Sequence, residues 1–222
     1  MKLCMIGTGY VGLVSGTCFA DIGNQVYCVD KDINKINKLN SGISPIYEPG
    51  LDELIKKNYN ANRLIFTTDI KKAINSSDLI FICVGTPTKK GSLKVDLSFV
   101  YKCVKEILKY TKKKKIIITK STVPVGTGDE IDKIVKKKKK LFSIISNPEF
   151  LREGEAIRDF RYPDRIVIGS DNKNEFKSMR KLYSPLISKG AKFFTTSRKG
   201  AELIKYASNA FLATKITFIN EL

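Results

Sequence analysis

The sequence contains no histidine, and its five cysteines form no paired motif. Without histidine, catalysis by an imidazole acid or base and metal ligation by imidazole are excluded. The cysteines lie inside apolar segments and include no CxxC pair, which predicts buried free thiols in a reducing compartment and no metal site. They are Cys4, Cys18, Cys28, Cys83 and Cys103.

Long hydrophobic runs are also missing. No apolar segment approaches the about 20 residues that a membrane-spanning helix needs. The first residues lead directly into an apolar segment without the pattern of a secretory leader. We therefore expect a cytoplasmic globular protein that makes no membrane contact.

Acidic residues are few beside the basic ones, since 22 Asp and Glu accompany 40 Lys and Arg, for a formal net charge of +18. Such an excess suggests a nucleic-acid partner. Much of it lies in two lysine runs, at 112–115 and 136–140, each just before a predicted strand. Parallel sheets bind ligands at the opposite ends of their strands, and no nucleic-acid motif accompanies the runs. We interpret them as solvated surface without nucleic acid, with polyanion binding as the open alternative.

The most informative segment that is present is Gly7-Thr8-Gly9-Tyr10-Val11-Gly12. It follows an apolar run at 3–6, which predicts a short buried strand, and it opens a predicted helix. In this context Gly7 permits a tight turn, Gly9 lets a pyrophosphate approach the backbone, and Gly12 lets the helix pack on the strand. Free N–H groups at the helix start would attract the phosphates. We predict a dinucleotide-binding turn, the alternative being a βα turn without a ligand.

A carboxylate stands at the sequence position expected for the residue that binds the ribose of a dinucleotide. Asp30 ends a second apolar run and lies 18 residues after Gly12, close to the about 20 expected for the acid that binds ribose hydroxyls. A carboxylate there repels a 2′-phosphate, which predicts NAD rather than NADP, although Lys31 beside it weakens that preference.

Apolar runs and helical periodicity alternate along the rest of the chain. Strands are predicted at 25–29, 64–67, 79–84, 116–119, 141–145, 165–169 and 192–195, and helices at 33–39, 51–57, 70–75, 97–110, near 155–157, and at 175–182. Asp69 is placed to cap the helix that starts at residue 70. The alternation predicts an α/β fold with a doubly wound, mainly parallel, Rossmann-type sheet and additional strands.

Four predicted strands end in polar loops that contain glycine or proline, after residues 6, 84, 119 and 145. Because the carboxyl ends of parallel strands meet at one edge of a sheet, we expect the loops to converge on an active site.

A further helix starts near residue 199 and reaches Leu222 without a stop signal. We predict a cofactor-binding domain over 1–198 and the start of a long central helix over 199–222, in a chain that is part of a longer protein.

Five motifs occur in order. They are Gly7-x-Gly9-Tyr10-Val11-Gly12, Val84-Gly85-Thr86-Pro87, Ser121-Thr122-Val123-Pro124-Val125-Gly126-Thr127, Asn147-Pro148-Glu149-Phe150-Leu151-Arg152-Glu153-Gly154 and Lys205-x-x-x-Asn209-Ala210-Phe211. Together they closely resemble the UDP-glucose 6-dehydrogenase family, within the wider UDP-glucose/GDP-mannose dehydrogenases.

The resemblance implies oxidation of the C6 alcohol of UDP-glucose to the carboxylate of UDP-glucuronate, with two NAD and a thioester on a cysteine of a sugar-nucleotide domain. None of the five cysteines matches that cysteine's motif, so this chain alone should bind NAD without completing the reaction. The resemblance further implies a homodimer built on the central helix and a role in polysaccharide biosynthesis.

Individual roles follow from the same resemblance. Lys205 and Asn209 lie four residues apart, hence on one helix face, and match a pair that stabilises developing negative charge. Thr122 matches a threonine that orders a water, Glu149 a proposed base, and Glu153 a carboxylate near the nicotinamide. The implied NAD contacts are Gly7, Gly9, Tyr10, Val11, Gly12, Asp30, Lys35, Thr86, Thr122 and Glu153. The implied substrate contacts are Glu149, Phe150, Leu151, Arg152, Glu153, Lys205 and Asn209.

Two alternatives stay open. The chain could belong to a dehydrogenase of another UDP-sugar, such as UDP-N-acetylmannosamine, although the segment 163–169 looks more like that of UDP-glucose enzymes. It could instead be a non-catalytic module that binds NAD or a polyanion. Taken alone, Lys205 would be an ordinary solvated helix lysine, and Glu149 an ordinary loop acid.

Overall fold

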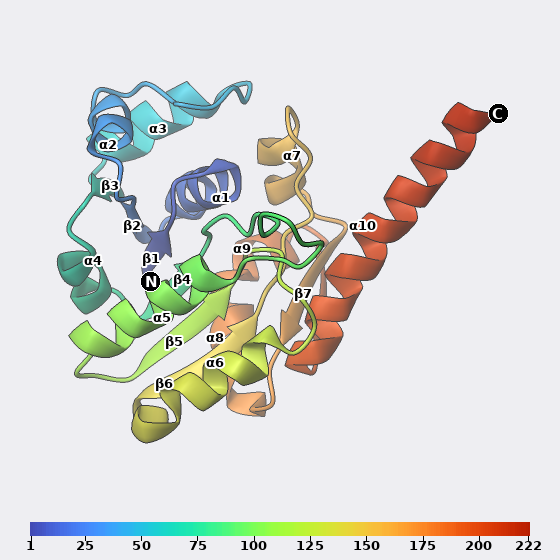
Figure 1. Cartoon of the computed structure of the whole chain (residues 1–222). Helices are drawn as coiled ribbons and strands as arrows, with labels where there is room; N and C mark the ends of the chain where they lie inside the picture. Colours follow the sequence, from blue (N-terminus) through green and yellow to red (C-terminus); the bar gives the residue numbers. More distant parts are fainter.

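The computed structural model describes residues 1–222, apart from the side chains of Lys137 and Lys139. Over this range one eight-stranded sheet runs in the order β3-β2-β1-β4-β5-β6-β7-β8 (Figure 1). Neighbouring strands are parallel except β6 and β7. The strands are β1 (Lys2–Ile6), β2 (Gln25–Val29), β3 (Leu64–Thr67), β4 (Leu79–Ile82), β5 (Lys115–Thr119), β6 (Phe142–Ser146), β7 (Arg165–Gly169) and β8 (Lys192–Thr196). The predicted doubly wound, mainly parallel sheet is confirmed.

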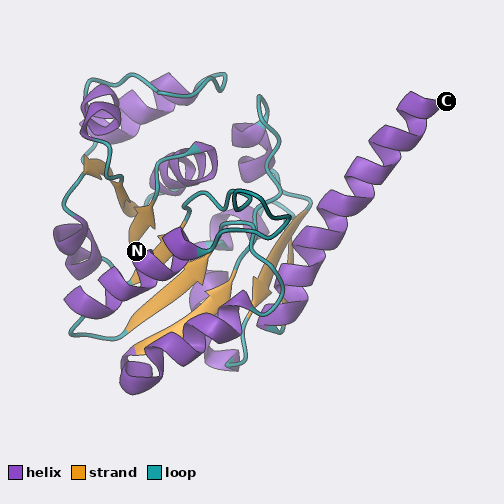
Figure 2. Ribbon diagram, viewed as in Figure 1, coloured by secondary structure: helices purple, strands orange, loops and turns teal.

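Helices pack against both faces of the sheet (Figure 2). They are α1 (Tyr10–Asp21), α2 (Ile33–Asn40), α3 (Leu51–Asn60), α4 (Ile70–Ser76), α5 (Ser98–Tyr110), α6 (Thr127–Val135), α7 (Ala156–Arg161), α8 (Lys173–Leu182), α9 (Ser184–Ile187) and α10 (Arg198–Glu221), with a 3-10 helix, η1 (Lys136–Leu141). Successive residues of β4 alternate between two cores: Leu79 and Phe81 contact the face covered by α1, α3 and α7, whereas Ile80 and Ile82 contact the face covered by α4, α5 and α6. A strand buried on both faces must be apolar throughout, which is why 79–82 carries no polar residue.

The antiparallel pairing of β6 with β7 determines which end of β7 lies beside the loops of the parallel strands. Ser146, at the end of β6, pairs with Gly169, at the end of β7. The first residue of β7, Arg165, therefore lies beyond the carboxyl end of β6, on the edge where the loops of the parallel strands meet.

The helices α4 and α6 are capped in different ways, one by a neighbouring residue and the other by a residue far away in the sequence. Asp69 caps α4 as predicted, since its Oδ1 accepts a hydrogen bond from Lys72 N at 2.9 Å. The helix α6 was not predicted, because its cap comes from a distant part of the chain. Gly126 and Gly128 donate their N–H groups to the Glu202 carboxylate of α10 at 2.6 and 2.8 Å.

The first turns of α10 pack on the sheet, and the rest of the helix extends away from the body (Figure 1). Ala201, Glu202 and Lys205 are buried, whereas every residue from 209 onward is exposed. The exposed part carries large apolar side chains, which are Phe211, Leu212, Ile216, Phe218, Ile219 and Leu222.

The lysine runs lie at the amino-terminal ends of β5 and β6, opposite the loop edge, as expected. One residue corrects the interpretation of the runs as solvated. Lys115 is 6% exposed, and its Nζ donates to the carbonyl oxygens of Ser77 and Asn75, because β5 begins beside the end of α4. Lys137 and Lys139 lie outside the described side chains.

All five cysteines are buried and free, as predicted. Among the residues that the structure describes, no helix is both long and apolar enough to cross a membrane. The same residues contain no cluster of three or more Cys, Asp or Glu placed to hold a metal ion.

Candidate functional site

The turn between β1 and α1 requires glycine at two positions. Gly7 has φ of +101°, and a Cβ there would lie 2.8 Å from the carbonyl oxygen of Cys83. A Cβ on Gly12 would lie 1.9 Å from the carbonyl oxygen of Gly7. No side chain fits either place, so the turn holds the start of α1 directly against the ends of β1 and β4.

Gly9 differs, because a Cβ there would have no heavy atom of the protein within 4 Å. Gly9 is the N-cap residue before α1, where no side chain accepts a hydrogen bond from the helix N–H groups, and Tyr10 and Val11 open the first helical turn. Free N–H groups and open space at a helix start form a cradle for phosphate. The residues present therefore fit a dinucleotide.

Asp30 follows β2 and faces this turn. Its Oδ2 accepts hydrogen bonds from Thr8 N at 2.9 Å and Thr8 Oγ1 at 2.8 Å, and Lys35 Nζ lies 3.3 Å from the same oxygen. Partial burial would raise the pKa of Asp30, but the hydrogen bonds from Thr8 and Asp32 and the charge of Lys35 outweigh it, so the pKa is lowered. The carboxylate stays ionised beside the cradle.

The loops after β4 and β5 contact each other. Thr86 Oγ1 donates to the carbonyl oxygen of Thr122 at 2.9 Å, and Ser121 Oγ donates to the carbonyl oxygen of Val84 at 2.7 Å. Two threonines that lie 36 residues apart in sequence are thus joined at the edge where the glycine turn lies.

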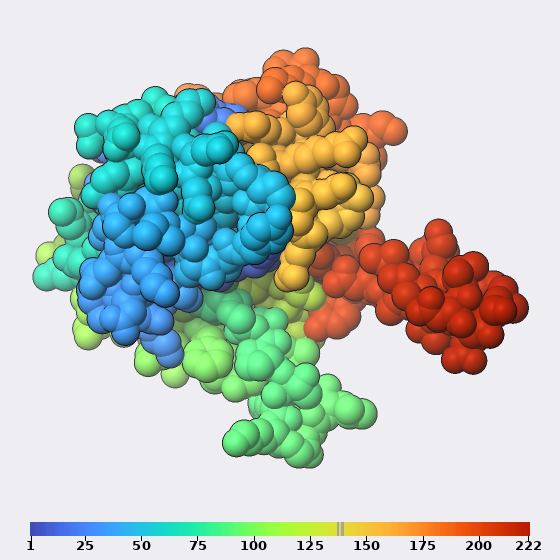
Figure 3. All heavy atoms as spheres, turned by 90° about the horizontal axis from the view of Figure 1, so that it is seen from above, coloured from blue at the N-terminus to red at the C-terminus, as the bar shows by residue number. Residues whose placement is uncertain are grey.

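A buried carboxylate joins the glycine turn to the loop after β6. Glu48, 6% exposed, accepts hydrogen bonds from Tyr10 Oη, from Gly154 N at 2.9 Å and from Ile157 N at 3.2 Å. Gly154 N also lies 2.8 Å from Tyr10 Oη. Figure 3 shows the segment around residue 48 packed against the segment around 154. Glu48 carries no sequence signal of its own, because only the irregular, proline-containing connection at 45–50 marks it.

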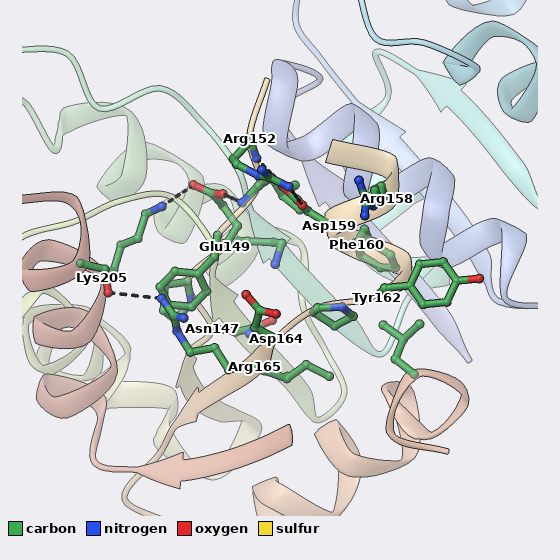
Figure 4. Close-up of a pocket in the computed structure, with 18 of the residues that line it drawn as sticks. Asn147, Glu149, Arg152, Arg158, Asp159, Phe160, Tyr162, Asp164, Arg165 and Lys205 are labelled. Carbon is green, nitrogen blue, oxygen red and sulfur yellow. Dashed lines mark hydrogen bonds and ion pairs between the residues drawn. The ribbon is translucent and has the colours of Figure 1, made fainter. Parts of the chain in front are cut away.

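The loop after β6 meets α10 through an ion pair. Lys205 Nζ lies 2.9 Å from Glu149 Oε1, and the two side chains are 8% and 10% exposed (Figure 4). Glu149 Oε2 accepts a hydrogen bond from Leu151 N at 2.6 Å, which fixes the carboxylate in place. Neither residue has the solvated position that it would have as an ordinary lysine or loop acid.

Phe150 lies between two cations. The Arg165 guanidinium is 4.3 Å and Lys205 Nζ is 5.3 Å from the centre of its ring. These groups and Asn209 line a cavity of about 780 Å³ between the loop after β6 and α10. The cavity brings together most of the predicted substrate contacts.

Two predicted residues lie apart from that cavity's polar centre. The Arg152 side chain is 65% exposed, and its guanidinium is 2.7 Å from Asp159 and 2.5 Å from Glu155 (Figure 4). Glu153 is exposed at the tip of the loop, next to Gly154. Lys120, to which no motif assigns a role, is 4% exposed and lines the cavity.

Residues 1–187 match the family model described as UDP-glucose/GDP-mannose dehydrogenase family, NAD binding domain, and residues 199–222 match the central domain of the same family. The chain belongs to the UDP-glucose/GDP-mannose dehydrogenase family. Because the larger match is the NAD-binding domain of this dehydrogenase family, NAD is the cofactor, as the sequence predicted.

Individual members of the dehydrogenase family are similar over the whole chain. A UDP-glucose 6-dehydrogenase of Rhizobium meliloti is 52% identical over 226 residues, covering 100% of this chain and 52% of that protein. A ternary complex of GDP-mannose dehydrogenase from Pseudomonas aeruginosa has a TM-score of 0.93 at 36% identity and covers 100% of this chain and 52% of that one. A UDP-glucose dehydrogenase of Pyrobaculum islandicum has a TM-score of 0.92 at 36% identity, covering 99% and 51%. The chain spans about half the length of the curated relatives it matches.

Proposed function

We propose that the chain is the cofactor-binding part of an NAD-dependent UDP-glucose 6-dehydrogenase, which oxidises the C6 alcohol of UDP-glucose to a carboxylate. The observation that carries this proposal is the buried Glu149–Lys205 pair in the cavity wall. Further support comes from the sequence, which is 52% identical to that of an enzyme named UDP-glucose 6-dehydrogenase. A lysine and a carboxylate held together out of water are suited to charge that develops during a reaction.

We assign the cofactor to the rim formed by the glycine turn. The N–H groups after Gly9 would hold the pyrophosphate, and Asp30, with Lys35 beside it, would bind the ribose hydroxyls. Thr86 and Thr122 would contact the nicotinamide half of NAD from the adjoining loops. When bound there, NAD supplies the acceptor for a hydride.

We assign the substrate to the cavity. Lys205 and Asn209 would donate hydrogen bonds to the sugar oxygen that becomes negative, and the ion pair with Glu149 would orient the ammonium. Glu149 would take a proton during the hydrolytic step, and Leu151 N would hold its carboxylate for that role. Phe150, Leu151 and Arg152 would provide the loop that encloses the sugar nucleotide, with Glu153 at its tip toward the cofactor.

The proposal includes a division of the chain at residue 198, with a cofactor domain before it and the start of a dimer-forming helix at 199–222. Support comes from the exposed apolar residues of α10, including Phe211, Leu212, Ile216 and Ile219, because such a face needs a partner surface. A homodimer through this helix would cover it. Five free buried cysteines support a reducing, cytoplasmic location, and the product would feed polysaccharide biosynthesis.

The test uses the full product of the gene. With NAD and UDP-glucose we expect NADH to form at two equivalents per substrate, since an alcohol loses two hydrides on the way to a carboxylate. GDP-mannose and UDP-N-acetylmannosamine serve as matched substrates. Turnover of UDP-glucose alone supports the proposal, whereas NADH formation with only one of the other sugar nucleotides contradicts the substrate assignment.

A further inference from the structure

Lys120 is a buried cation in the wall of the cavity. It directly follows β5 and lies two residues beyond Ile118, whose side chain packs on the face covered by α1 and α7. Side chains two residues apart along a strand point to the same face. Lys120 therefore points to the cavity side of the sheet, and it is 4% exposed where it lines the cavity.

Other buried lysines in this fold have oxygen partners. Lys205 is also buried, and its Nζ pairs with Glu149 at 2.9 Å. Lys115, at the other end of the same strand, donates to two backbone carbonyl oxygens. Within the part of the chain that the structure describes, the Lys120 ammonium has no hydrogen-bond or ion-pair partner.

The surroundings of Lys120 make this position costly. Burial lowers its pKa, the nearby Cys83 and Glu149 act in the opposite direction, and Lys205 lowers it further. Removing most of a lysine side chain from water beside another cation, without an oxygen partner, destabilises a protein. The Lys120 ammonium is not fully enclosed, so it keeps contact with the cavity. A lysine in this position beside a cavity can donate a hydrogen bond to an oxygen atom of a bound ligand.

We propose that Lys120 is a further substrate-binding residue of this site, which donates a hydrogen bond to the oxygen on the sugar carbon that is oxidised. The proposal rests on the proposed function, since Glu149 and Lys205 define which part of the ligand lies between them. A hydrogen bond from an ammonium to a carboxylate is stronger than one to an alcohol. Lys120 therefore holds the carboxylate product more tightly than the alcohol substrate.

The test compares Lys120→Met with Lys115→Met in the full product of the gene. Each variant replaces a buried lysine at one end of β5, but only Lys120 lines the cavity. Calorimetry measures the affinities for NAD, UDP, UDP-glucose and UDP-glucuronate. For Lys120→Met we expect a loss of about tenfold to hundredfold for UDP-glucuronate, a smaller loss for UDP-glucose, and unchanged affinity for UDP and NAD. Lys115→Met should leave all four affinities unchanged.

A second measurement does not depend on the ligand. Removing an unpartnered buried cation should raise the midpoint of thermal unfolding of Lys120→Met, whereas Lys115→Met should lower it by orphaning two carbonyl groups. Equal losses for UDP and UDP-glucuronate, no loss for either, or a lowered midpoint for Lys120→Met would overturn the inference alone. An unmodified protein that binds NAD but none of the three uridine nucleotides would overturn the proposed function, and the inference with it.

Discussion

Lys205 Nζ and Glu149 Oε1 lie 2.9 Å apart, and each side chain is at most 10% exposed. Lys205→Met leaves a buried carboxylate whose remaining hydrogen bond comes from Leu151 N. We expect this variant to lose about 3–5 kcal/mol of unfolding free energy in urea titrations. In a double-mutant cycle, Lys205→Met should lower the free energy of unfolding less in the Glu149→Gln background than it does in the unmodified protein. A loss below about 1 kcal/mol for Lys205→Met, typical of an exposed pair, would contradict the buried geometry.

Gly9 and Gly12 should separate cofactor binding from folding. A Cβ on Gly9 meets no protein atom within 4 Å, so Gly9→Ala should unfold within about 1 kcal/mol of the parent. Its NAD affinity should fall by at least about tenfold, because the methyl group occupies the space that a pyrophosphate needs. Gly12→Ala is the matched control, since its Cβ would lie 1.9 Å from a carbonyl oxygen and should disrupt folding itself. An unchanged NAD affinity for folded Gly9→Ala would refute the cradle.

Asp30 should select NAD over NADP. Asp30→Ala should lower NAD affinity by about tenfold to hundredfold, since it removes the charged acceptor that we propose for the ribose hydroxyls. The same variant should bind NADP no worse than the parent does, because the repulsion of the 2′-phosphate disappears. Calorimetric titrations with both nucleotides measure the two effects, and equal losses for NAD and NADP would count against the assignment.

The pH dependence of NAD binding follows from the same carboxylate. The folded pKa of Asp30 is lowered from 3.8, so the stabilisation that depends on its charge is present above that pH and is lost as the pH falls through the folded value. We expect NAD affinity to show no transition of Asp30 above pH 3.8. A carboxylate transition above that value, absent from Asp30→Ala, would show that Thr8 and Lys35 do not hold the charge.

Glu48 should couple the glycine turn to the loop after β6. Glu48→Ala leaves the N–H groups of Gly154 and Ile157 without their acceptor, at a cost of about 1–3 kcal/mol each. Tyr10→Phe keeps that acceptor and should cost about 1 kcal/mol. Urea unfolding measures both, and amide hydrogen exchange at Gly154 should accelerate much more in Glu48→Ala. Equal effects of the two substitutions would place the stabilisation in the tyrosine instead.

The features predicted well from sequence are those set by nearby residues. The apolar strand predicted at 79–84, the cap at Asp69 and the glycine turn at Gly7 were each marked by local sequence. The structure contains all three, although the strand ends at Ile82. The convergence of loops followed from strand direction alone, and the contact between Thr86 and Thr122 is consistent with it.

The features missed depend on distant partners. The helix α6 is capped by Glu202 of α10, 76 residues away from Gly126, so no local pattern marks its start. Glu48 acts on Gly154, 106 residues away. Lys115 and Lys120 look like ordinary surface lysines in the sequence, and only the packing of the sheet buries them. Burial of polar groups is decided by tertiary structure. Motifs therefore suggest candidate site residues, whereas the buried groups that support those residues have no local signal.

The most direct test of the account is a map of backbone amide shifts as NAD is titrated into the isotope-labelled protein. We predict the largest changes at Gly9, Tyr10, Asp30, Thr86 and Thr122, along one edge of the sheet. Changes centred instead on the opposite edge, at Lys115, Phe142 and Asn172, would contradict the placement of the cofactor and every role assigned from it.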